Sequence, residues 1–371
     1  MGNVNEYPKI HSNIRTFSTI KQLKRHSHDV SCIKLNDAIS PLLLSYPKYK
    51  HPTISQRKTG HIQIYGVNSY RGLCKKYNED RVSIFLNIKK HHHNYPKHLS
   101  IFCLFDGHSG SKCCDFLRDN FHRYFLKSKL FPFDIKGAIS DAFSRLEKYF
   151  LNLAISEENS LLDKSGSCAL VLIIADNMIY IANVGDSRAI MSNYHGKEIV
   201  SLTEDHKPNV IKERKRIKQN EGVVYKVNSC NTLYRILPGN LSVSRTIGDA
   251  KSKIPFLGGK LGVVISTPDI VSFRFDERKN DFIVLGSDGI FDKLDNEEIV
   301  KGIWSTLGTS ESMGKDANEQ AGICADMTIK LAMSKRSKDN VSAIFIGFKN
   351  FVDEYTKKRE MFNMQSRSLC N

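Results

Sequence analysis

Five acidic sites divide this sequence, and each borders an apolar run with the composition of a β-strand. They are Asn78-Glu79-Asp80, Asp106-Gly107-His108, Asp186, Asp288 with Asp292, and Asp339-Asn340. A carboxylate at the end of an apolar strand is costly to bury unless it meets a positive charge. Several such sites can share one region only if cations offset their repulsion, and all-oxygen ligands favour Mg²⁺ or Mn²⁺ over zinc or copper. The sequence therefore predicts a fold that gathers strand ends around divalent metal ions.

The apolar runs between these sites predict a layered α+β fold. Strands are expected at residues 61–67, 82–88, 99–105, 168–175, 178–184, 188–192, 282–285 and 341–348. Helical spacing of apolar residues predicts helices at 111–127, 135–156, 210–220, 295–306 and 318–334. Asp176-Asn177 is a two-residue turn, so residues 168–184 are expected to form a hairpin. Hairpins combined with helix pairs favour antiparallel sheets over a doubly wound parallel sheet.

Charge and helix-breaking residues set the expected domain boundaries. The formal net charge is +16. Residues 1–60 carry ten Lys or Arg against three Asp or Glu, contain four prolines and show no sustained apolar period. These features predict a basic, flexible N-terminal extension. The folded domain is expected at residues 61–350, and residues 351–371 are expected to form a C-terminal tail.

Composition also limits the partners. A basic surface favours phosphorylated or otherwise anionic partners. No arginine-rich block or interleaved aromatic pattern is present, so specific nucleic-acid binding is not expected. The longest apolar run, residues 168–175, is far shorter than the ~20 residues of a spanning helix.

The expected location follows from the cysteines and the N-terminus. Nine cysteines without metal-site or disulfide spacing favour a cytoplasmic or nuclear protein. Removal of Met1 would expose Gly2, and acylation there, together with the basic extension, would give weak membrane association. However, Glu6 stands where the myristoylation pattern has Ser or Thr.

The acidic sites lie within motifs that follow one another in a fixed order, at residues 78–80, 104–110, 165–167, 182–189, 202–208, 241–249, 287–292 and 338–341. In this combination the chain resembles the protein phosphatase 2C family, the metal-dependent serine/threonine phosphatases, over about residues 61–350. The resemblance implies an αββα sandwich, in which two packed antiparallel sheets are flanked by helix pairs. It also implies hydrolysis of phosphoserine and phosphothreonine by direct attack of a water that bridges two Mg²⁺ or Mn²⁺ ions.

The resemblance assigns the metal ligands residue by residue. Asp106 would bridge the two ions. Asp288 and Asp339 would complete the shell of one ion. Glu79 and the carbonyl of Gly107 would bind the other ion.

The remaining matches complete the implied site. Asp186 and Asp292 belong to the acidic cluster of a weaker third metal site, and Asp80 would hold a metal-bound water. His108 would protonate the leaving serine or threonine oxygen, because a histidine titrates near neutral pH. Lys75 stands where the family commonly has an arginine that binds the substrate phosphate, and lysine supplies charge without the bidentate geometry of arginine.

No departure from the family pattern removes a predicted ligand, so the sequence predicts an active phosphatase. It is expected to act on phosphorylated proteins as a monomer without an obligatory regulatory subunit. Two alternatives stay open: a catalytically weak scaffold or regulatory binding protein with the phosphatase fold, and a metal-dependent hydrolase of another phosphoester such as nucleic acid. The basic segment 203–240 is either a surface for acidic substrates or a solvated helix face.

Overall fold

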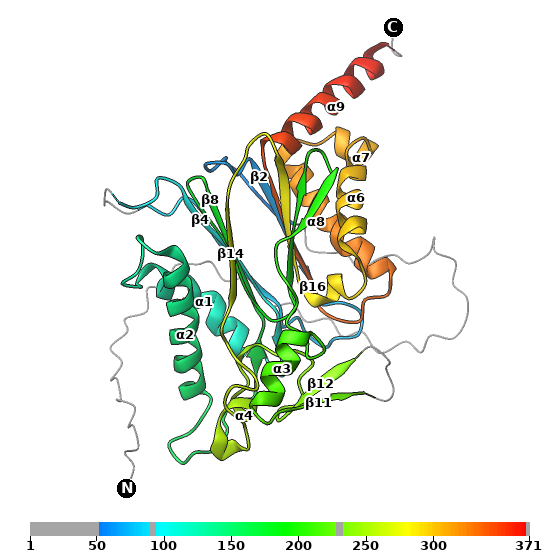
Figure 1. Cartoon of the computed structure of the whole chain (residues 1–371). Coiled ribbons are helices and arrows are strands. Elements are labelled where there is room, and N and C mark those ends of the chain that lie inside the picture. Colours follow the sequence, from blue (N-terminus) through cyan, green and yellow to red (C-terminus); the bar gives the residue numbers. More distant parts are fainter. Residues whose placement is uncertain (1–51, 90–93, 228–232, 369–371) are drawn as a thin grey trace, which may run out of the picture. The chain divides into compact units, whose positions relative to one another are not determined.

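Two antiparallel sheets form the centre of the fold (Figure 1). The computed structural model describes residues 52–89, 94–227 and 233–368. The first sheet has the strand order β1-β2-β16-β15-β9-β10, and the second has the order β14-β8-β7-β4-β3. The described residues also form a three-stranded sheet, β13-β6-β5, and a two-stranded sheet, β11-β12.

The strands are short, as the sequence predicts. The first sheet contains β1 (Thr53–Ile54), β2 (Ile64–Tyr70), β9 (Arg188–Asn193), β10 (Glu198–Ser201), β15 (Asn280–Gly286) and β16 (Val341–Gly347). The second contains β3 (Arg81–Phe85), β4 (Leu99–Phe105), β7 (Ala169–Ala175), β8 (Met178–Val184) and β14 (Asp269–Arg274). The smaller sheets contain β5 (Gly107–His108), β6 (Gly166–Ser167), β11 (Val223–Lys226), β12 (Tyr234–Leu237) and β13 (Ile247–Gly248).

Helices lie outside the sheets, and most of them form two groups (Figure 1). They are α1 (Lys112–Leu126), α2 (Ile135–Leu153), α3 (Ile211–Gln219), α4 (Ala250–Lys253), α5 (Asp288–Phe291), α6 (Asn296–Thr306), α7 (Ser310–Met313), α8 (Ala317–Ser334) and α9 (Lys349–Ser368). Figure 1 shows α1 and α2 beside the sheet that contains β4 and β8, with α6 and α8 on the opposite side beside β16.

The alternation of side chains along β4 explains the layers. Phe102 and Leu104 belong to the core between the sheets, together with residues of β15 and β16. Their neighbours Ile101 and Cys103 belong to the core that α1 and α2 cover. Successive side chains of a strand point to opposite faces, so one apolar strand supplies two cores.

The first sheet also buries apolar side chains on both of its faces. Val284 and Phe345 pack with α6 and α8, while Ile283 and Ile344 face the core between the sheets. The order of layers is therefore helices, sheet, sheet, helices, and the predicted αββα sandwich is confirmed. The predicted hairpin is also confirmed, because β7 pairs with β8 across a turn in which Asp176 has a φ of 49°.

The ordered fold extends beyond residues 61–350 at both ends. Within the expected extension, β1 pairs with β2, with Thr53 opposite Val67. Within the expected tail, α9 begins at Lys349, and its Phe351 and Tyr355 are 0% and 1% exposed. The aromatic core formed by Phe282, Trp304 and Phe345 receives Phe351, a contact that local sequence does not show. Gly2 and the rest of residues 1–51 lie outside the described residues.

No helix in the described ranges is long and apolar enough to cross a membrane.

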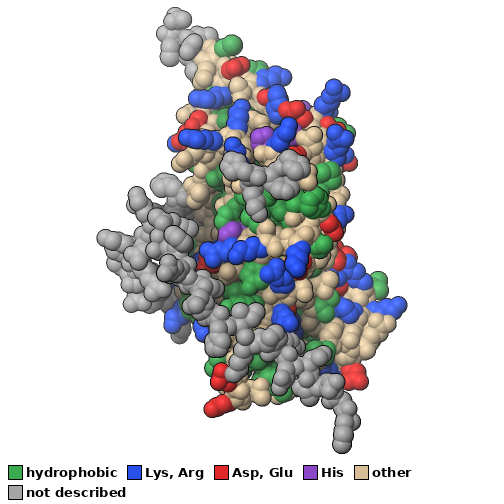
Figure 2. Space-filling model, turned by 90° about the vertical axis from the view of Figure 1, so that its left-hand side faces the viewer, with side chains coloured by type: hydrophobic (Ala, Val, Ile, Leu, Met, Phe, Trp, Pro, Cys, Tyr) green, Lys and Arg blue, Asp and Glu red, His purple; other side chains and the backbone are tan. Residues whose placement is uncertain are grey.

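Figure 2 shows the side of the molecule on which α1 and α2 lie, where Lys and Arg side chains are scattered among hydrophobic ones. Leu130, Phe133 and Leu153 are among the exposed apolar side chains of this helix pair and its connection. Six cysteines of the described part are free, and five of these six are buried.

Candidate active site

The predicted acidic residues lie where strands of both large sheets end. Asp80 immediately precedes β3, and Asp106 immediately follows β4. Asp186 lies just beyond β8, Asp288 begins α5 after β15, and Asp339 lies just before β16. The backbone N–H of Asp288 donates to Asp106 Oδ2 over 3.4 Å, which joins the two sheets at this point.

Seven of the ten predicted site residues line one pocket of about 420 Å³. They are Lys75, Asp106, Gly107, His108, Asp186, Asp288 and Asp339. The pocket is also lined by Ser109 and Cys168, and by residues 239–243 with Arg235. The fold therefore brings four carboxylates from separate segments to one hollow, and such a group attracts cations.

The other three predicted residues lie around this pocket. Glu79 Oε1 accepts a hydrogen bond of 2.7 Å from the backbone N–H of Gly110. Asp80 is buried behind the pocket, where its Oδ2 accepts from Ser342 Oγ over 2.6 Å. Asp292 lies 2.7 Å from Lys207 Nζ.

Asn340 connects the first and last motifs of the site. Its side-chain oxygen accepts from the backbone N–H of Glu79 over 2.9 Å, and its amide donates to the carbonyl of Arg71 over 2.7 Å. A Cβ atom at Gly289 would lie only 2.0 Å from the Asn340 carbonyl oxygen. The Asp-Gly pair at the start of α5 is therefore a place of close backbone approach.

Burial and mutual repulsion dominate the electrostatics of the acids. Burial, followed by the charges of Asp288, Asp80 and Asp186, raises the pKa of Asp106 well above its ordinary value. Burial and the charges of Asp186 and Asp339 do the same to the pKa of Asp288. Burial raises the pKa of Asp80 and of Asp186 to about 6 in each case.

Two basic side chains face these acids. Lys75 Nζ lies 2.6 Å from Asp339 Oδ1. Burial lowers the pKa of Lys75, but the hydrogen bond and charge of Asp339 more than offset this and leave it raised. Burial also lowers the pKa of His108, and the charge and hydrogen bond of Asp249 reverse the shift, so the net direction is upward.

The donor set fits hard divalent cations. Every predicted ligand offers oxygen, and Asp80 Oδ1 is buried without a hydrogen-bond partner. An excess of buried negative charge needs a cation, and Lys75 supplies only one. Within the described ranges, no three acidic, His or Cys side chains already converge as a metal-binding group.

This charge excess predicts how pH affects the stability of the metal-free chain. The pKa of Asp186 rises from 3.8 to about 6 on folding. The contribution of this side chain to the stability of the fold is therefore fully present below pH 3.8 and is lost as pH rises through about 6. The loss should reach up to about 3 kcal/mol. With chelator present, Asp186→Asn should lose less stability than wild type between pH 4 and 7 in urea unfolding. Parallel pH profiles of the two proteins would contradict this expectation.

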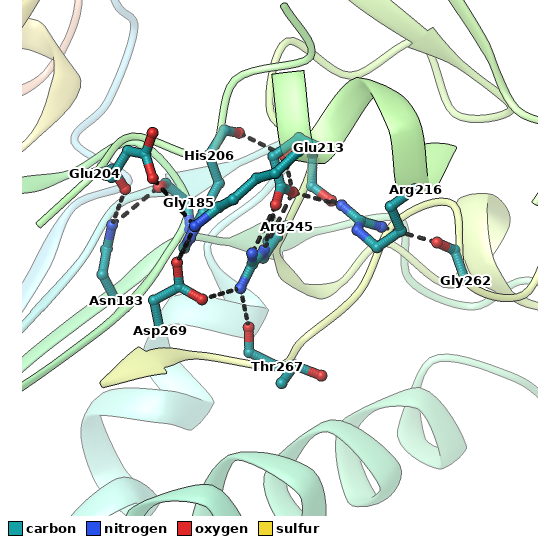
Figure 3. A network of polar contacts seen from close by, with 12 residues as sticks. Asn183, Gly185, Glu204, His206, Glu213, Arg216, Arg245, Gly262, Thr267 and Asp269 are labelled. Carbon is teal, nitrogen blue, oxygen red and sulfur yellow. Dashed lines mark hydrogen bonds and ion pairs between the residues drawn. The ribbon is translucent and has the colours of Figure 1, made fainter. Parts of the chain in front are cut away.

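A second polar network anchors the segment between β10 and β14 (Figure 3). Arg245, whose side chain is 8% exposed, donates to both carboxylate oxygens of Glu213 on α3. The same guanidinium donates to Asp269 Oδ1 over 2.7 Å and to the Thr267 carbonyl over 3.0 Å. His206 Nε2 lies 3.3 Å from Asp269 Oδ2, and its Nδ1 accepts from the backbone N–H of Gly185.

Several basic side chains of segment 203–240 form ion pairs with acids in and around this network. Lys212 pairs with Glu204 and Asp269, and Arg216 pairs with Glu213. Lys207 pairs with acids as well, at Asp205 and Asp292. These cations are therefore paired with acids of the chain itself, which limits how much of the segment's charge is available to an acidic substrate.

Sequence reasoning did not identify every residue at the pocket. Arg235 on β12 lines it, and its guanidinium donates to the Asn240 carbonyl. Asp249, which no predicted role includes, is the hydrogen-bond partner of His108. Its position in the motif at residues 241–249 was the available signal. Cys168 also lines the pocket, and its thiol lies 3.4 Å from Asp186 Oδ1.

Comparison with known proteins agrees with this architecture. The model of the family described as Protein phosphatase 2C matches residues 66–341. Protein phosphatase 1L of Bos taurus is 28% identical over 298 residues, which cover 79% of this chain and 74% of the relative. Probable protein phosphatase 2C member 13, mitochondrial, of Oryza sativa subsp. japonica is 34% identical over 250 residues, covering 67% of this chain and 60% of the relative.

A solved structure shows the same fold. The serine-threonine phosphatase 2C from Toxoplasma gondii aligns with a TM-score of 0.60 at 19% identity, over 77% of this chain and 95% of that one. The sandwich, its acid-lined pocket and these matches place the chain in the class of protein phosphatases. Within this class, the chain belongs to the Protein phosphatase 2C family.

Proposed function

We propose that this chain is a Mg²⁺- or Mn²⁺-dependent protein serine/threonine phosphatase. The observation that carries the proposal is a group of carboxylates, drawn from separate strand ends, that borders a pocket with Lys75 and His108. Asp186 is buried, and Asp106, Asp288 and Asp339 are half-buried. Bound divalent ions would offset this charge, polarise the phosphoryl oxygens and activate water for attack on phosphorus. The family relationship supports the same activity.

The carboxylates would hold the ions in the arrangement that the family resemblance implies. Asp106 would be shared by both ions, with Asp288 and Asp339 on one side and Glu79 and the Gly107 carbonyl on the other. Asp186 and Asp292 would serve a weaker third ion. For Asp292 this requires release of Lys207, which now lies 2.7 Å away.

The remaining side chains would handle the substrate and the proton. The unpartnered Oδ1 of Asp80 is available to orient a water. Lys75 would bind the substrate phosphate once metal takes over its partner Asp339, and Arg235 offers a second cation at the same pocket. His108 would donate a proton to the leaving serine or threonine oxygen.

The direct test is phosphate release from a phosphothreonine peptide by the purified full chain. We expect turnover with Mn²⁺ or Mg²⁺, none with chelator, and no cleavage of an oligonucleotide under the same conditions. Absence of turnover in protein shown to be folded would contradict the proposal and would favour a scaffold that retains the phosphatase fold. Cleavage of the oligonucleotide alone would indicate a different phosphoester hydrolase.

A further inference from the structure

His108 and Asp249 form a contact that the predicted roles do not explain. His108 Nε2 lies 3.0 Å from Asp249 Oδ1 and 2.9 Å from Asp249 Oδ2. The Asp249 side chain is 5% exposed, whereas that of His108 is 28% exposed and borders the pocket. An ionised carboxylate only accepts hydrogen bonds, so Nε2 carries the proton in this contact. The other ring nitrogen, Nδ1, is then the one left for a substrate.

The three-stranded sheet explains how the two residues meet. His108 ends β5, Asp249 directly follows β13, and β6 lies between these strands. His108 and Gly248 both pair with Gly166 on β6. A Cβ atom at Gly166 would lie 2.1 Å from Asp249 Oδ2 and 2.6 Å from His108 Nε2. The glycine therefore leaves the space in which the imidazole and the carboxylate touch.

The backbone at Asp249 is fixed from both sides. Its N–H donates to the Ser165 carbonyl over 3.1 Å. The N–H of the preceding Gly248 donates to Glu147 Oε2 on α2 over 2.9 Å. Lys253, whose side chain is 7% exposed, pairs with the same glutamate and donates to the Thr246 carbonyl over 2.7 Å. Two buried side chains thus hold the segment that presents the carboxylate.

We propose that Asp249 is a positioning residue that holds His108 with Nε2–H toward the carboxylate and Nδ1 toward the leaving oxygen of the substrate. The proposal rests on the proposed phosphatase function. As the bond between phosphorus and the leaving oxygen breaks, its electron pair stays on that oxygen, which takes the proton from Nδ1 of the imidazolium. Water supplies the oxygen that phosphorus gains and leaves its two protons on the product phosphate. The products are the free alcohol, dihydrogen phosphate and neutral His108 with Nε2–H.

The test compares leaving groups in the full chain. Asp249→Asn should lower kcat on a phosphothreonine peptide about 100-fold, because the alkoxide needs a proton, and should change kcat on p-nitrophenyl phosphate less than about threefold. His108→Gln should show the same split, and the double variant should add little to either single loss. Equal losses on both substrates, or none on the peptide, would overturn the proposal, because a merely structural role does not depend on the leaving group.

Nitrogen-detected NMR of the His108 ring provides a readout that does not need activity. In the wild type, the neutral ring should be the Nε2–H tautomer, and Asp249→Asn should lose this preference. If the wild type hydrolyses neither substrate, the proposed function fails, and the tautomer alone decides whether Asp249 positions the ring. A neutral wild-type ring that is protonated on Nδ1 would overturn the proposal, and this measurement stands even if Asp249→Asn does not fold.

Discussion

Replacing Asp288 by asparagine is expected to reduce metal-dependent phosphate release about a thousandfold, which corresponds to roughly 4 kcal/mol of transition-state stabilisation. Asp288 lies between the ends of the two large sheets, next to Asp106 and Asp339 in the same pocket. An asparagine has nearly the same shape but carries no negative charge. The variant would therefore lose attraction for divalent ions while its backbone contacts remain.

The same substitution should not destabilise the metal-free fold. Burial and the charges of neighbouring acids raise the pKa of Asp288 well above its ordinary value, so the ionised side chain opposes folding at neutral pH. We expect Asp288→Asn without metal to unfold at the same or a higher temperature than wild type. It should also gain less stability from added Mn²⁺.

Asp119→Asn is the matched control, because Asp119 is 57% exposed and pairs only at the surface with Arg118. This variant should keep wild-type turnover and the wild-type response to metal. Near-normal turnover of Asp288→Asn would contradict the assigned role. A folded but inactive variant that still gains full stability from Mn²⁺ would show that Asp288 contributes to the chemistry without holding metal.

Glu213→Gln is expected to lower the free energy of unfolding by about 3 kcal/mol, because it removes one partner of a buried ion pair. The side chains of Glu213 and Arg245 are 2% and 8% exposed, respectively. Asp269 still faces Arg245 in the variant, which places the expected loss at the lower end of the range for buried pairs. The measurement is urea unfolding at neutral pH.

The pH dependence of unfolding tests whether the negative charge of Glu213 causes this loss of stability. Arg245, Ser244 and Arg216 outweigh burial and lower the pKa of Glu213 from 4.5 to about 2. A group whose pKa is lower in the folded state stabilises the fold at pH values above its unfolded pKa, and this stabilisation is lost as pH falls. The difference in unfolding free energy between wild type and Glu213→Gln should therefore shrink as pH falls from 4.5 to about 2.

The control is Glu221→Gln, since Glu221 is 84% exposed and its partner Lys260 is also at the surface. We expect this change to alter stability by less than about 0.5 kcal/mol. If Glu213→Gln and Glu221→Gln unfold at the same urea concentration, the network does not stabilise the fold as inferred. A selective loss in Glu213→Gln would show that α3 depends on this pair for its place in the fold.

Several parts of the fold and site were predictable because their causes are local. The apolar pattern of residues 99–105 and 168–184 predicts strands, and the structure confirms them as β4, β7 and β8. The pocket also gathers Asp106, Asp288 and Asp339, as expected for acids that terminate such strands. Whether these residues bind metal in the implied arrangement stays a prediction.

Other parts could not be predicted because they depend on contacts between distant segments. The C-terminal residues form α9 because Phe351 and Tyr355 are buried by aromatic and backbone groups from other elements. The sequence left the basic residues near α3 as either a solvated face or a surface for acidic substrates, and in the structure Lys212 and Arg216 pair with acids of the chain. Sequence patterns show which residues are charged, and do not show which charges meet.

The sequence by itself determined the layered α+β class, because this depends on apolar periodicity. Short motifs in a fixed order determined the family resemblance, which implies the αββα fold and the acids that border the pocket. Only the tertiary structure decided the partners of the site residues: Lys75 with Asp339, and His108 with Asp249 across Gly166. Those pairs join residues far apart in the chain, and a side-chain interaction of a few ångströms depends on how strands and loops pack in three dimensions.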